Sequence, residues 1–288
     1  MKPSSAKDLS RLLKEFSVSP LKRFGQNFLI DENILNNIAD AAHLSGDDSV
    51  LEIGPGAGAL TLALCKRAGR VVAVEIDKGL IPLLGRTLAD CDNAEIIEGD
   101  ILDPNVLGKA ASILGGGFKV VANLPYYITT PVLMALLESG YDISAMVLMV
   151  QREVADRLCA APGTKEYGVL SVAARYYADA ETVIRVPASC FYPRPDVDSA
   201  VVRLVTRSLP EKPKDTPLFF SVVRAAFAMR RKTLINNLVA KFSNIGRDNL
   251  IKLLIASEID PKRRGETLSI DEFISLSNNI LNFSTSVF

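Results

Sequence analysis

Short, nearly continuous runs of Val, Ile and Leu recur along the first part of the chain, at residues 49–53, 71–75, 95–98, 119–122 and 145–150. Such runs are typical of strands buried on both faces of a sheet. Between them, residues 59–68 and 78–91 place their apolar side chains at helical spacing. Strands that alternate with helices in this way predict βαβ units, and therefore an α/β fold with a parallel sheet covered on both faces.

Two later strand-like runs, 181–186 and 199–205, are not joined by a helix-length stretch, which predicts an antiparallel pair. Residues 207–218 are rich in Pro and charge and predict a linker. Ser269 followed by Glu272 fits a capping box at the start of a helix. Helical spacing continues to the end of the chain, over residues 219–242, 247–258 and 269–281. We therefore expect an α/β domain over residues 1–208 and a small helical domain over residues 209–288.

Composition narrows the class of protein. No apolar run approaches the ~18 residues of a membrane span, and the N-terminus lacks an apolar signal-peptide core, so we expect a cytoplasmic protein without a membrane partner. Four widely spaced cysteines and one histidine, His43, offer no sequence-local zinc site. We expect reduced thiols, no metal, and catalysis without a histidine base or a thiol nucleophile.

The formal net charge is zero, but it is unevenly distributed. Residues 207–288 hold thirteen Lys and Arg against eight Asp and Glu, a net of +5, with local clusters at 229–232 and 262–264. This asymmetry points weakly to a polyanionic partner. Solvated helix faces explain the charge equally well.

The loop after the first strand reads EIGPGAGA, residues 52–59. Its glycines permit a tight strand-to-helix turn and the close approach of a ligand to the backbone. Glu75 ends the next strand, twenty-one residues beyond Gly54, where a carboxylate can accept from two ribose hydroxyls. The loop also fits a G-x-G-x-x-A dinucleotide fingerprint or a simple tight turn, and by itself does not decide between them.

Two acidic residues favour another cofactor over NAD. Glu52 lies just before the glycines, and Asp100 follows the third strand, where it could accept from an adenine amine. This arrangement resembles the S-adenosylmethionine (SAM) site of class I methyltransferases, in which the loop packs on methionine and ribose. An NAD enzyme would also need a hydride-handling residue, and none is evident.

The fourth strand ends in Asn123-Leu124-Pro125-Tyr126, at the sheet edge where open α/β sheets bind ligands. An adenine N6 is a poor nucleophile because its lone pair is delocalised into the ring. Two acceptors aimed at its hydrogens, the Asn123 side-chain oxygen and the Leu124 carbonyl, would favour a tetrahedral nitrogen with an available lone pair. Pro125 stiffens the turn, and Tyr126 can stack on the base. The alternative is an ordinary turn.

Asn-Leu-Pro-Tyr resembles the N6-adenine methyltransferase motif in the form used by the ribosomal RNA adenine dimethyltransferases. The similarity runs from about Lys22 to near the end of the chain. Tyr127 stands where many relatives have Asn, and the residues before Leu21 match nothing. Four further segments resemble that family: FGQNFLID (24–31), FYPRPDVDSAVVRL (191–204), AFAMRRKTLINNL (226–238) and RRGETLSIDEF (263–273).

The resemblance implies a class I SAM-dependent methyltransferase (Rossmann-like) sheet with a small C-terminal helical domain. It implies N6,N6-dimethylation of two adjacent adenosines near the 3′ end of 16S rRNA, within the small ribosomal subunit or its precursor, by a monomer acting in ribosome biogenesis. By analogy, SAM contacts fall on Asn27, Leu29, Gly54, Glu75, Asp100 and Asn123.

The rRNA side of the resemblance involves aromatic and basic residues. Phe191 would stack on the target base opposite Tyr126; the less favoured alternative for either ring is plain core packing. Phosphate contacts would come from the basic residues Lys22, Arg23, Arg230, Arg231, Lys232, Lys262, Arg263 and Arg264.

Two rival functions remain open. A large-subunit rRNA adenine methyltransferase would share the SAM sheet and the stacking residues, but the strings VDSAVVRL and AFAMRRKTL favour the small-subunit branch of the family. A non-catalytic binder on the same fold would not need the intact glycine loop, Glu75, Asp100 and Asn123. Binding of SAM separates the second rival from the enzymes, and the choice of RNA separates the first.

Overall fold

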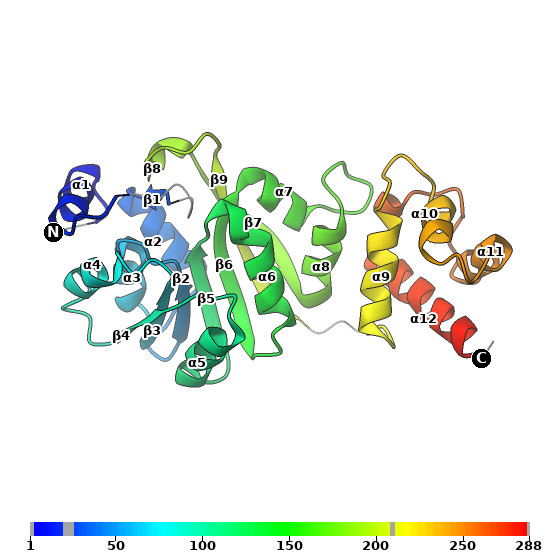
Figure 1. Ribbon diagram of the computed structural model, residues 1–288, viewed down its shortest axis with the longest axis horizontal. Coiled ribbons are helices and arrows are strands. Elements are labelled where there is room, and N and C mark those ends of the chain that lie inside the picture. The colour runs from blue at the N-terminus through cyan, green and yellow to red at the C-terminus, as the bar shows by residue number, and fades with distance from the viewer. Residues whose placement is uncertain (1–2, 20–25, 208–210, 287–288) are drawn as a thin grey trace. The chain divides into compact units, whose positions relative to one another are not determined.

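The computed structural model describes residues 3–19, 26–207 and 211–286 (Figure 1). The chain divides into two compact units, Met1–Ala155 with Ala180–Thr206, and Asp156–Asp179 with Arg207–Phe288. The second unit takes up the chain again at Arg207, close to the boundary expected at 208/209. It also includes residues 156–179, which the sequence placed in the α/β domain.

The first unit is built on a seven-stranded sheet. Five adjacent strands are parallel, from the edge strand inward β4, β3, β2, β5 and β6. Strand β9 then pairs antiparallel with β6. The predicted α/β class and parallel order are therefore confirmed, and β7 neighbours β9 at the far edge. In spatial order the strands are β4 (Ala94–Glu98), β3 (Arg70–Glu75), β2 (Ser49–Ile53), β5 (Phe118–Asn123), β6 (Ile143–Gln151), β9 (Ser199–Thr206) and β7 (Ala178–Val186).

Helices cover both faces of this sheet. On one face, α2 (Glu32–Ala41) and α3 (Ala59–Cys65) share an apolar cluster with strand residues such as Val50 and Val121. Helices α5 (Pro104–Leu114) and α6 (Thr129–Glu138) lie in front of the sheet in Figure 1, and α4 (Ile81–Thr87) follows β3. With both faces covered, ligand-binding groups are left to the edge formed by the carboxyl ends of the parallel strands.

The N-terminal segment contributes two elements that no sequence pattern predicted. Helix α1 (Ala6–Glu15) begins at Ser5, whose side chain accepts from the Asp8 N–H, and its leucines pack against Phe28 and Leu80. Strand β1 (Phe28–Leu29) pairs antiparallel with β8 (Phe191–Tyr192), bringing Leu29 opposite Phe191. This short pair joins the N-terminal segment to a region that follows most of the sheet in sequence.

The second unit is helical. Helix α9 ends at Ala226 and α10 begins at Leu234, so the stretch 219–242 is not the continuous helical run that its spacing suggested. The Asn237 side chain donates to the carbonyls of Ala226 (2.9 Å) and Met229 (3.2 Å), which fixes the turn between the two helices. The helices of this unit are α8 (Val169–Tyr177), α9 (Thr216–Ala226), α10 (Leu234–Lys241), α11 (Arg247–Ala256) and α12 (Ile270–Ser286), together with the part of α7 (Arg152–Cys159) that begins at Asp156.

The predicted capping box at the start of α12 is confirmed. The Glu272 N–H donates to Ser269 Oγ (3.2 Å), and the Ser269 N–H donates to Glu272 Oε2 (2.8 Å). Just before it, the buried Tyr167 hydroxyl donates to the Leu268 carbonyl (3.0 Å), and the Tyr167 ring packs edge-on against Phe227. These contacts explain why residues 156–179 group with the C-terminal helices.

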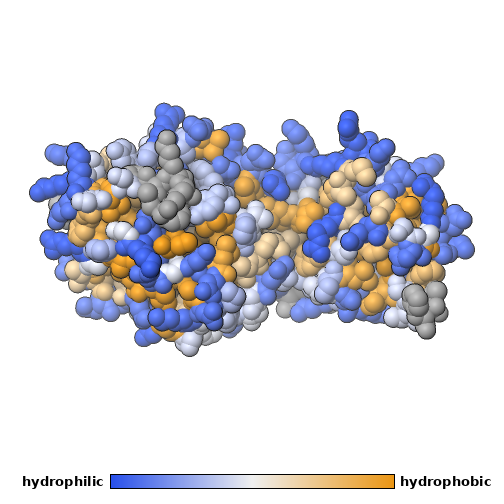
Figure 2. All heavy atoms as spheres, in the orientation of Figure 1, coloured by the Kyte–Doolittle hydropathy of each residue, from blue (hydrophilic) through white to orange (hydrophobic). Residues whose placement is uncertain are grey.

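No helix within the described ranges is both long and apolar enough to cross a membrane. Figure 2 shows hydrophilic residues along much of the visible surface, with hydrophobic residues exposed between them. Several of the exposed apolar side chains, Ile76, Leu102 and Tyr127, follow strand ends of the sheet.

Candidate active site

A pocket lies at the carboxyl ends of β2, β3, β4 and β5, and it is completed by residues 26–29 and by Phe191. Every residue that the sequence predicted for the cofactor or the target base borders this one pocket: Asn27, Leu29, Gly54, Glu75, Asp100, Asn123, Leu124, Pro125, Tyr126 and Phe191. Segments from six places in the sequence therefore meet at a single site.

The glycine loop is shaped by its contact with Glu75. Gly54 and Gly56 have φ values of +67° and +60°, which side-chain-bearing residues rarely adopt. A Cβ on Gly56 would lie 3.1 Å from the Phe28 ring. The Gly56 N–H donates to Glu75 Oε2 (3.1 Å), and the Asp77 N–H donates to Glu75 Oε1 (2.9 Å). The loop and the carboxylate thus hold one another in place.

Glu75 is 4% exposed. Burial raises the pKa of its carboxyl, while the hydrogen bonds from Asp77 and Gly56 act in the opposite direction. A carboxylate oxygen can accept more than one hydrogen bond, so Glu75 keeps capacity for the hydroxyls of a ribose after its two backbone contacts. The two backbone contacts fix the orientation of the carboxylate, and therefore the direction from which it can accept further hydrogen bonds.

Glu52 is the second buried carboxyl on the pocket wall, at 1% exposure. Burial raises its pKa to about 8; the Thr61 hydroxyl opposes this and the charge of Glu75 adds to it. Among the described residues its Oε2 has no hydrogen-bond partner. An orphaned acceptor of this kind suits a ligand with positively charged groups, and SAM carries a sulfonium and an ammonium group.

Asp100 and Tyr127 form the outer side of the pocket. Asp100 is exposed, and its Oδ1 accepts from the Leu102 N–H (2.9 Å). Tyr127 is 53% exposed. The partial burial of its hydroxyl raises the pKa of that group, and the nearby charges of Asp100 and Glu75 raise it further. Ile76, 40% exposed, adds apolar surface at the same end. The combination of a carboxylate and flat or apolar side chains suits a purine with an exocyclic amine.

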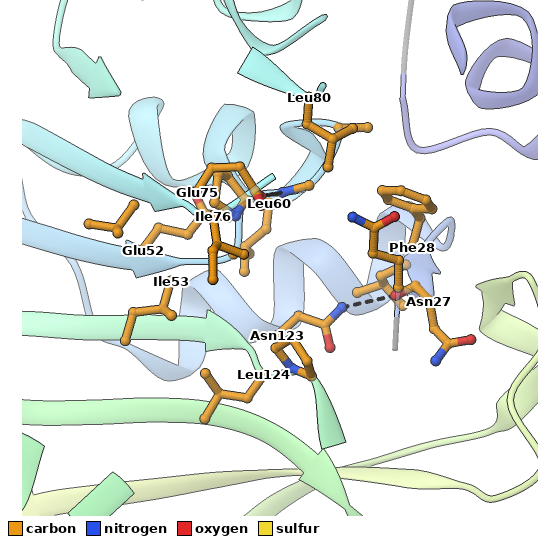
Figure 3. A pocket seen from close by; sticks show the side chains of 18 of the residues that line it. Asn27, Phe28, Glu52, Ile53, Leu60, Glu75, Ile76, Leu80, Asn123 and Leu124 are labelled. Atoms are coloured by element: carbon orange, nitrogen blue, oxygen red, sulfur yellow. Dashed lines mark hydrogen bonds between the residues drawn. The ribbon is translucent and has the colours of Figure 1, made fainter. Parts of the chain in front are cut away.

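The orientation of the Asn123 amide is set by the N-terminal segment. Its Nδ2 donates to the main-chain carbonyl of Asn27 (3.3 Å), as Figure 3 shows. The amide oxygen is then the atom left for a substrate amine. The Leu124 N–H donates to the Met149 carbonyl (3.1 Å), which ties the turn after β5 to the neighbouring strand β6.

Two aromatic residues border the predicted base site in different ways. Tyr126 is partly buried, and its hydroxyl lies 2.8 Å from Ser199 Oγ. Phe191 is 3% exposed and packs in the cluster that contains Leu29, while part of its surface still borders the pocket. Phe191 therefore belongs to the core and to the pocket wall at once.

Sequence reasoning missed the residues that support the site from behind. Gln26 Nε2 donates to Asp77 Oδ2 (2.7 Å), and Asp77 Oδ1 accepts from the Gly79 N–H (3.0 Å). Asp77 is 8% exposed, and it therefore binds the N-terminal segment to the loop after β3. Ser199 lies within the FYPRPDVDSAVVRL segment, and the sequence gives it no role of its own. None of these three residues stands out in a local pattern, because each has a partner that is distant in sequence.

The predicted phosphate contacts do not form one group. Lys22 and Arg23 lie outside the described residues. Arg230 Nη2 donates to the carbonyls of Lys165 (2.6 Å) and Tyr167 (2.9 Å), so it binds residues 165–167 to the turn before α10.

The cluster at 262–264 likewise contains one arginine that is bound within the protein and others that are exposed. Arg263 is bound to Glu272 and donates to the Thr267 carbonyl (2.7 Å) at the start of α12. Arg231, Lys232, Lys262 and Arg264 are exposed. Of these four side chains, only that of Arg264 forms an ion pair with a described residue, Glu266 at 4.0 Å. Four of the six described basic candidates are thus available to a partner.

Comparisons with known proteins agree with this site. Residues 20–277 match the family described as Ribosomal RNA adenine dimethylase. A protein named Ribosomal RNA small subunit methyltransferase A from Geobacillus sp. (strain WCH70) is 50% identical over 272 residues, which cover 93% of this chain and 94% of the relative. One of the same name from Bacillus mycoides (strain KBAB4) is 49% identical over 284 residues, covering 97% and 96%.

Solved structures show the same architecture. A dimethyladenosine transferase from Plasmodium falciparum superimposes with a TM-score of 0.75 at 25% identity, covering 89% of this chain and 97% of that one. The 23S rRNA methyltransferase ErmE gives 0.66 at 27% identity, covering 88% and 99%. The fold is that of a class I methyltransferase, and SAM is the methyl donor that the pocket fits. The chain belongs to the ribosomal RNA adenine dimethylase family.

Proposed function

We propose that this enzyme dimethylates N6 of two adjacent adenosines near the 3′ end of small-subunit (16S) rRNA, within the small ribosomal subunit or its precursor. The observation that carries the proposal is the tethered amide of Asn123, whose oxygen is left for an amine beside a pocket suited to SAM. The names of relatives at about half identity over nearly the whole chain support the choice of the small subunit.

SAM supplies an electrophilic methyl group on its sulfonium. Glu75, held by two backbone N–H groups, would accept from the ribose hydroxyls, and Asp100 from the adenine amine. Gly54 and Gly56 let the ligand approach the backbone, and Asn27 and Leu29 cover it from the N-terminal segment.

The target adenine would be extruded from the RNA and stacked between Tyr126 and Phe191. Asn123 Oδ1 and the Leu124 carbonyl would accept from its amine, which directs the N6 lone pair at the methyl group. In the transfer, the N6–C bond would form as the S–C bond of SAM breaks, and the amine would lose one proton to water. Acceptor dipoles stabilise the positive charge that develops on N6, so no strong base is required.

The second methylation places a different demand on the same acceptors. N6-methyladenosine has one N–H left, so only one of the two acceptors can be used. The Asn123 amide is tethered through its nitrogen, and it therefore presents an acceptor in both rounds without having to turn over.

The RNA beyond the target base would be held by its phosphates. Arg231, Lys232, Lys262 and Arg264 are the exposed basic candidates of the second unit, and contacts of this type position RNA without reading its sequence. We propose that the protein acts as a cytoplasmic monomer on the ribosomal particle.

The test is methyl transfer from labelled SAM to small-subunit particles that lack the modification, followed by nucleoside analysis. The expected product is N6,N6-dimethyladenosine. Asn123→Ala should lower its rate of formation by roughly 100-fold or more and change the Kd for SAM far less. Asn37→Ala on α2 is the matched control, because it also removes a side-chain amide, but one that is exposed and does not border the pocket.

A second candidate, methylation of large-subunit rRNA, is favoured by the superposition on ErmE. Transfer to large-subunit RNA, with none to small-subunit particles, would establish it instead. If the protein failed to bind SAM, a non-catalytic binding role would replace both.

A further inference from the structure

The hydroxyl of Tyr126 does not point to solvent. It lies 2.8 Å from Ser199 Oγ, a contact between residues 73 positions apart in sequence. Burial raises the pKa of the Tyr126 hydroxyl, so it is protonated at neutral pH and able to donate. The ring of Tyr126 borders the pocket, so the bond holds one end of a pocket-lining ring to a different strand.

Ser199 is a rigid partner. It is 0% exposed and pairs with Gln151 where β9 meets β6. The preceding residue, Asp198, is held at both ends, since its Oδ1 accepts from the Ala188 N–H (3.0 Å) and its carbonyl accepts from the Arg152 N–H (3.0 Å). The Ser199 hydroxyl therefore presents a fixed point to the ring.

The segment that ends at Ser199 also carries Phe191. Phe191 is fixed by its pairing with Leu29 and by burial in the core cluster. We call the space between the rings of Phe191 and Tyr126 the base slot. Residues 191–199 place its Phe191 wall directly, and the Ser199 hydrogen bond attaches its Tyr126 wall to the same segment.

We propose that Ser199 is a positioning residue for RNA methylation: through its bond to the Tyr126 hydroxyl it sets the tilt of that ring relative to Phe191, and so the width of the base slot. This inference rests on the function proposed above. A phenylalanine or an untethered tyrosine in the same place still offers a stacking face. It loses the fixed orientation that brings N6 into line with the methyl group, and misalignment at a reacting centre lowers the rate.

The test is a double-mutant cycle with Tyr126→Phe, Ser199→Ala and the double variant. Single-turnover methyl transfer to small-subunit particles is measured with enzyme and SAM saturating, and the Kd for SAM is measured by calorimetry. Each single variant should lower the rate roughly three- to tenfold, the range expected for one lost hydrogen bond. The double variant should be no slower than the slower single variant, and all three should keep the wild-type Kd for SAM within about twofold.

Matched controls remove one hydroxyl each at the opposite end of β6, where Tyr141→Phe and Ser144→Ala lie away from the pocket. These should retain the wild-type rate. Should Ser199→Ala not fold, Ser199→Cys replaces it in the cycle, because it keeps the volume and offers a poor hydrogen-bond partner.

Three results would overturn the inference. Rate losses that multiply in the double variant would mean that the two residues act independently, and a Ser199→Ala rate equal to that of the controls would mean that the bond has no role in transfer. A parallel loss of SAM affinity would show a general structural defect, which also contradicts a positioning role. If wild-type enzyme methylates no small-subunit RNA, the proposed function fails first, and that result is distinct from all of these.

Discussion

Glu52 and Glu75 are two buried carboxyls in one pocket, and they differ in their hydrogen-bond partners. Glu75 accepts from two backbone N–H groups, whereas Glu52 Oε2 has no partner among the described residues. Burial therefore acts on Glu52 with less opposition, and its pKa reaches about 8. At neutral pH the folded protein holds Glu52 largely protonated until a cationic ligand arrives.

This difference predicts how Glu52→Gln changes the pH dependence of stability. The carboxyl pKa is about 8 in the folded protein against 4.5 for the free group, so the wild type loses stability as pH rises between these values, where only the unfolded chain releases the proton. Glutamine does not titrate. Without ligand, the variant should match the wild type near pH 5 and gain on the order of 3 kcal/mol relative to it by pH 8.

Urea titrations at pH 5 and pH 8 measure this difference. Glu98→Gln, which removes an exposed carboxylate at the end of β4, is the matched control. Wild-type and Glu52→Gln stabilities that run parallel across the range would contradict a raised pKa at Glu52.

Single residues were predictable from sequence where they stood next to a recognisable strand end. Gly54, Glu75, Asp100 and Asn123 all follow runs of aliphatic residues, and the structure brings them to one pocket. Ser199 escaped notice because its role depends on a partner 73 positions away, and such a bond leaves no spacing to detect.

At the scale of elements, prediction succeeded where side-chain periodicity is long enough to see. The five parallel strands were found within a few residues. Four of them, β2, β3, β5 and β6, are buried on both faces and are therefore rich in Val, Ile and Leu, whereas the edge strand β4 is marked only by Ile96 and Ile97. Strands β1 and β8 have two residues each, too few for any period. The break between α9 and α10 depends on Asn237 and on Gly265, where a Cβ would lie 2.6 Å from the Ala226 carbonyl oxygen, and neither contact is local.

The start of α12 yields a prediction that separates a structural arginine from one that we propose to bind RNA. Arg263 is bound to Glu272 of the capping box and to Thr267, so Arg263→Ala should lower the free energy of unfolding by about 1–2 kcal/mol. Arg264→Ala should leave it unchanged, since that side chain is 55% exposed and 4.0 Å from its acidic neighbour. Chemical denaturation followed by circular dichroism measures both, and equal losses would refute the distinction.

At the scale of the whole molecule, the basic excess lies in residues 207–288, but only part of it is free to meet RNA. Arg231→Ser combined with Lys232→Ser should weaken binding to small-subunit particles and flatten its salt dependence by roughly one to two units in the log–log slope. The Kd for SAM should not change. Filter binding over a salt series measures the slope for the double variant and for each of its two single substitutions. Lys109→Ser on α5 is the control for each single substitution, because it also removes one positive charge.

A loss of SAM affinity equal to the loss of particle binding would point to a folding defect rather than to lost phosphate contacts. Arg230 is left out of the variant because it binds residues 165–167. The same contact shows why the grouping of residues 156–179 with the C-terminal helices could not be foreseen. Their spacing identifies helices, but it does not say which part of the chain those helices pack against.

The pairing of β1 with β8 has a consequence for synthesis of the chain. The N-terminal segment that covers the pocket has its partner strand at Phe191 and Tyr192, and Phe191 is itself part of the wall. A polypeptide that emerges N-terminus first therefore carries an unfinished pocket until these residues have left the exit tunnel. About two thirds of the chain is thus synthesised before the N-terminal segment can pair with its partner strand.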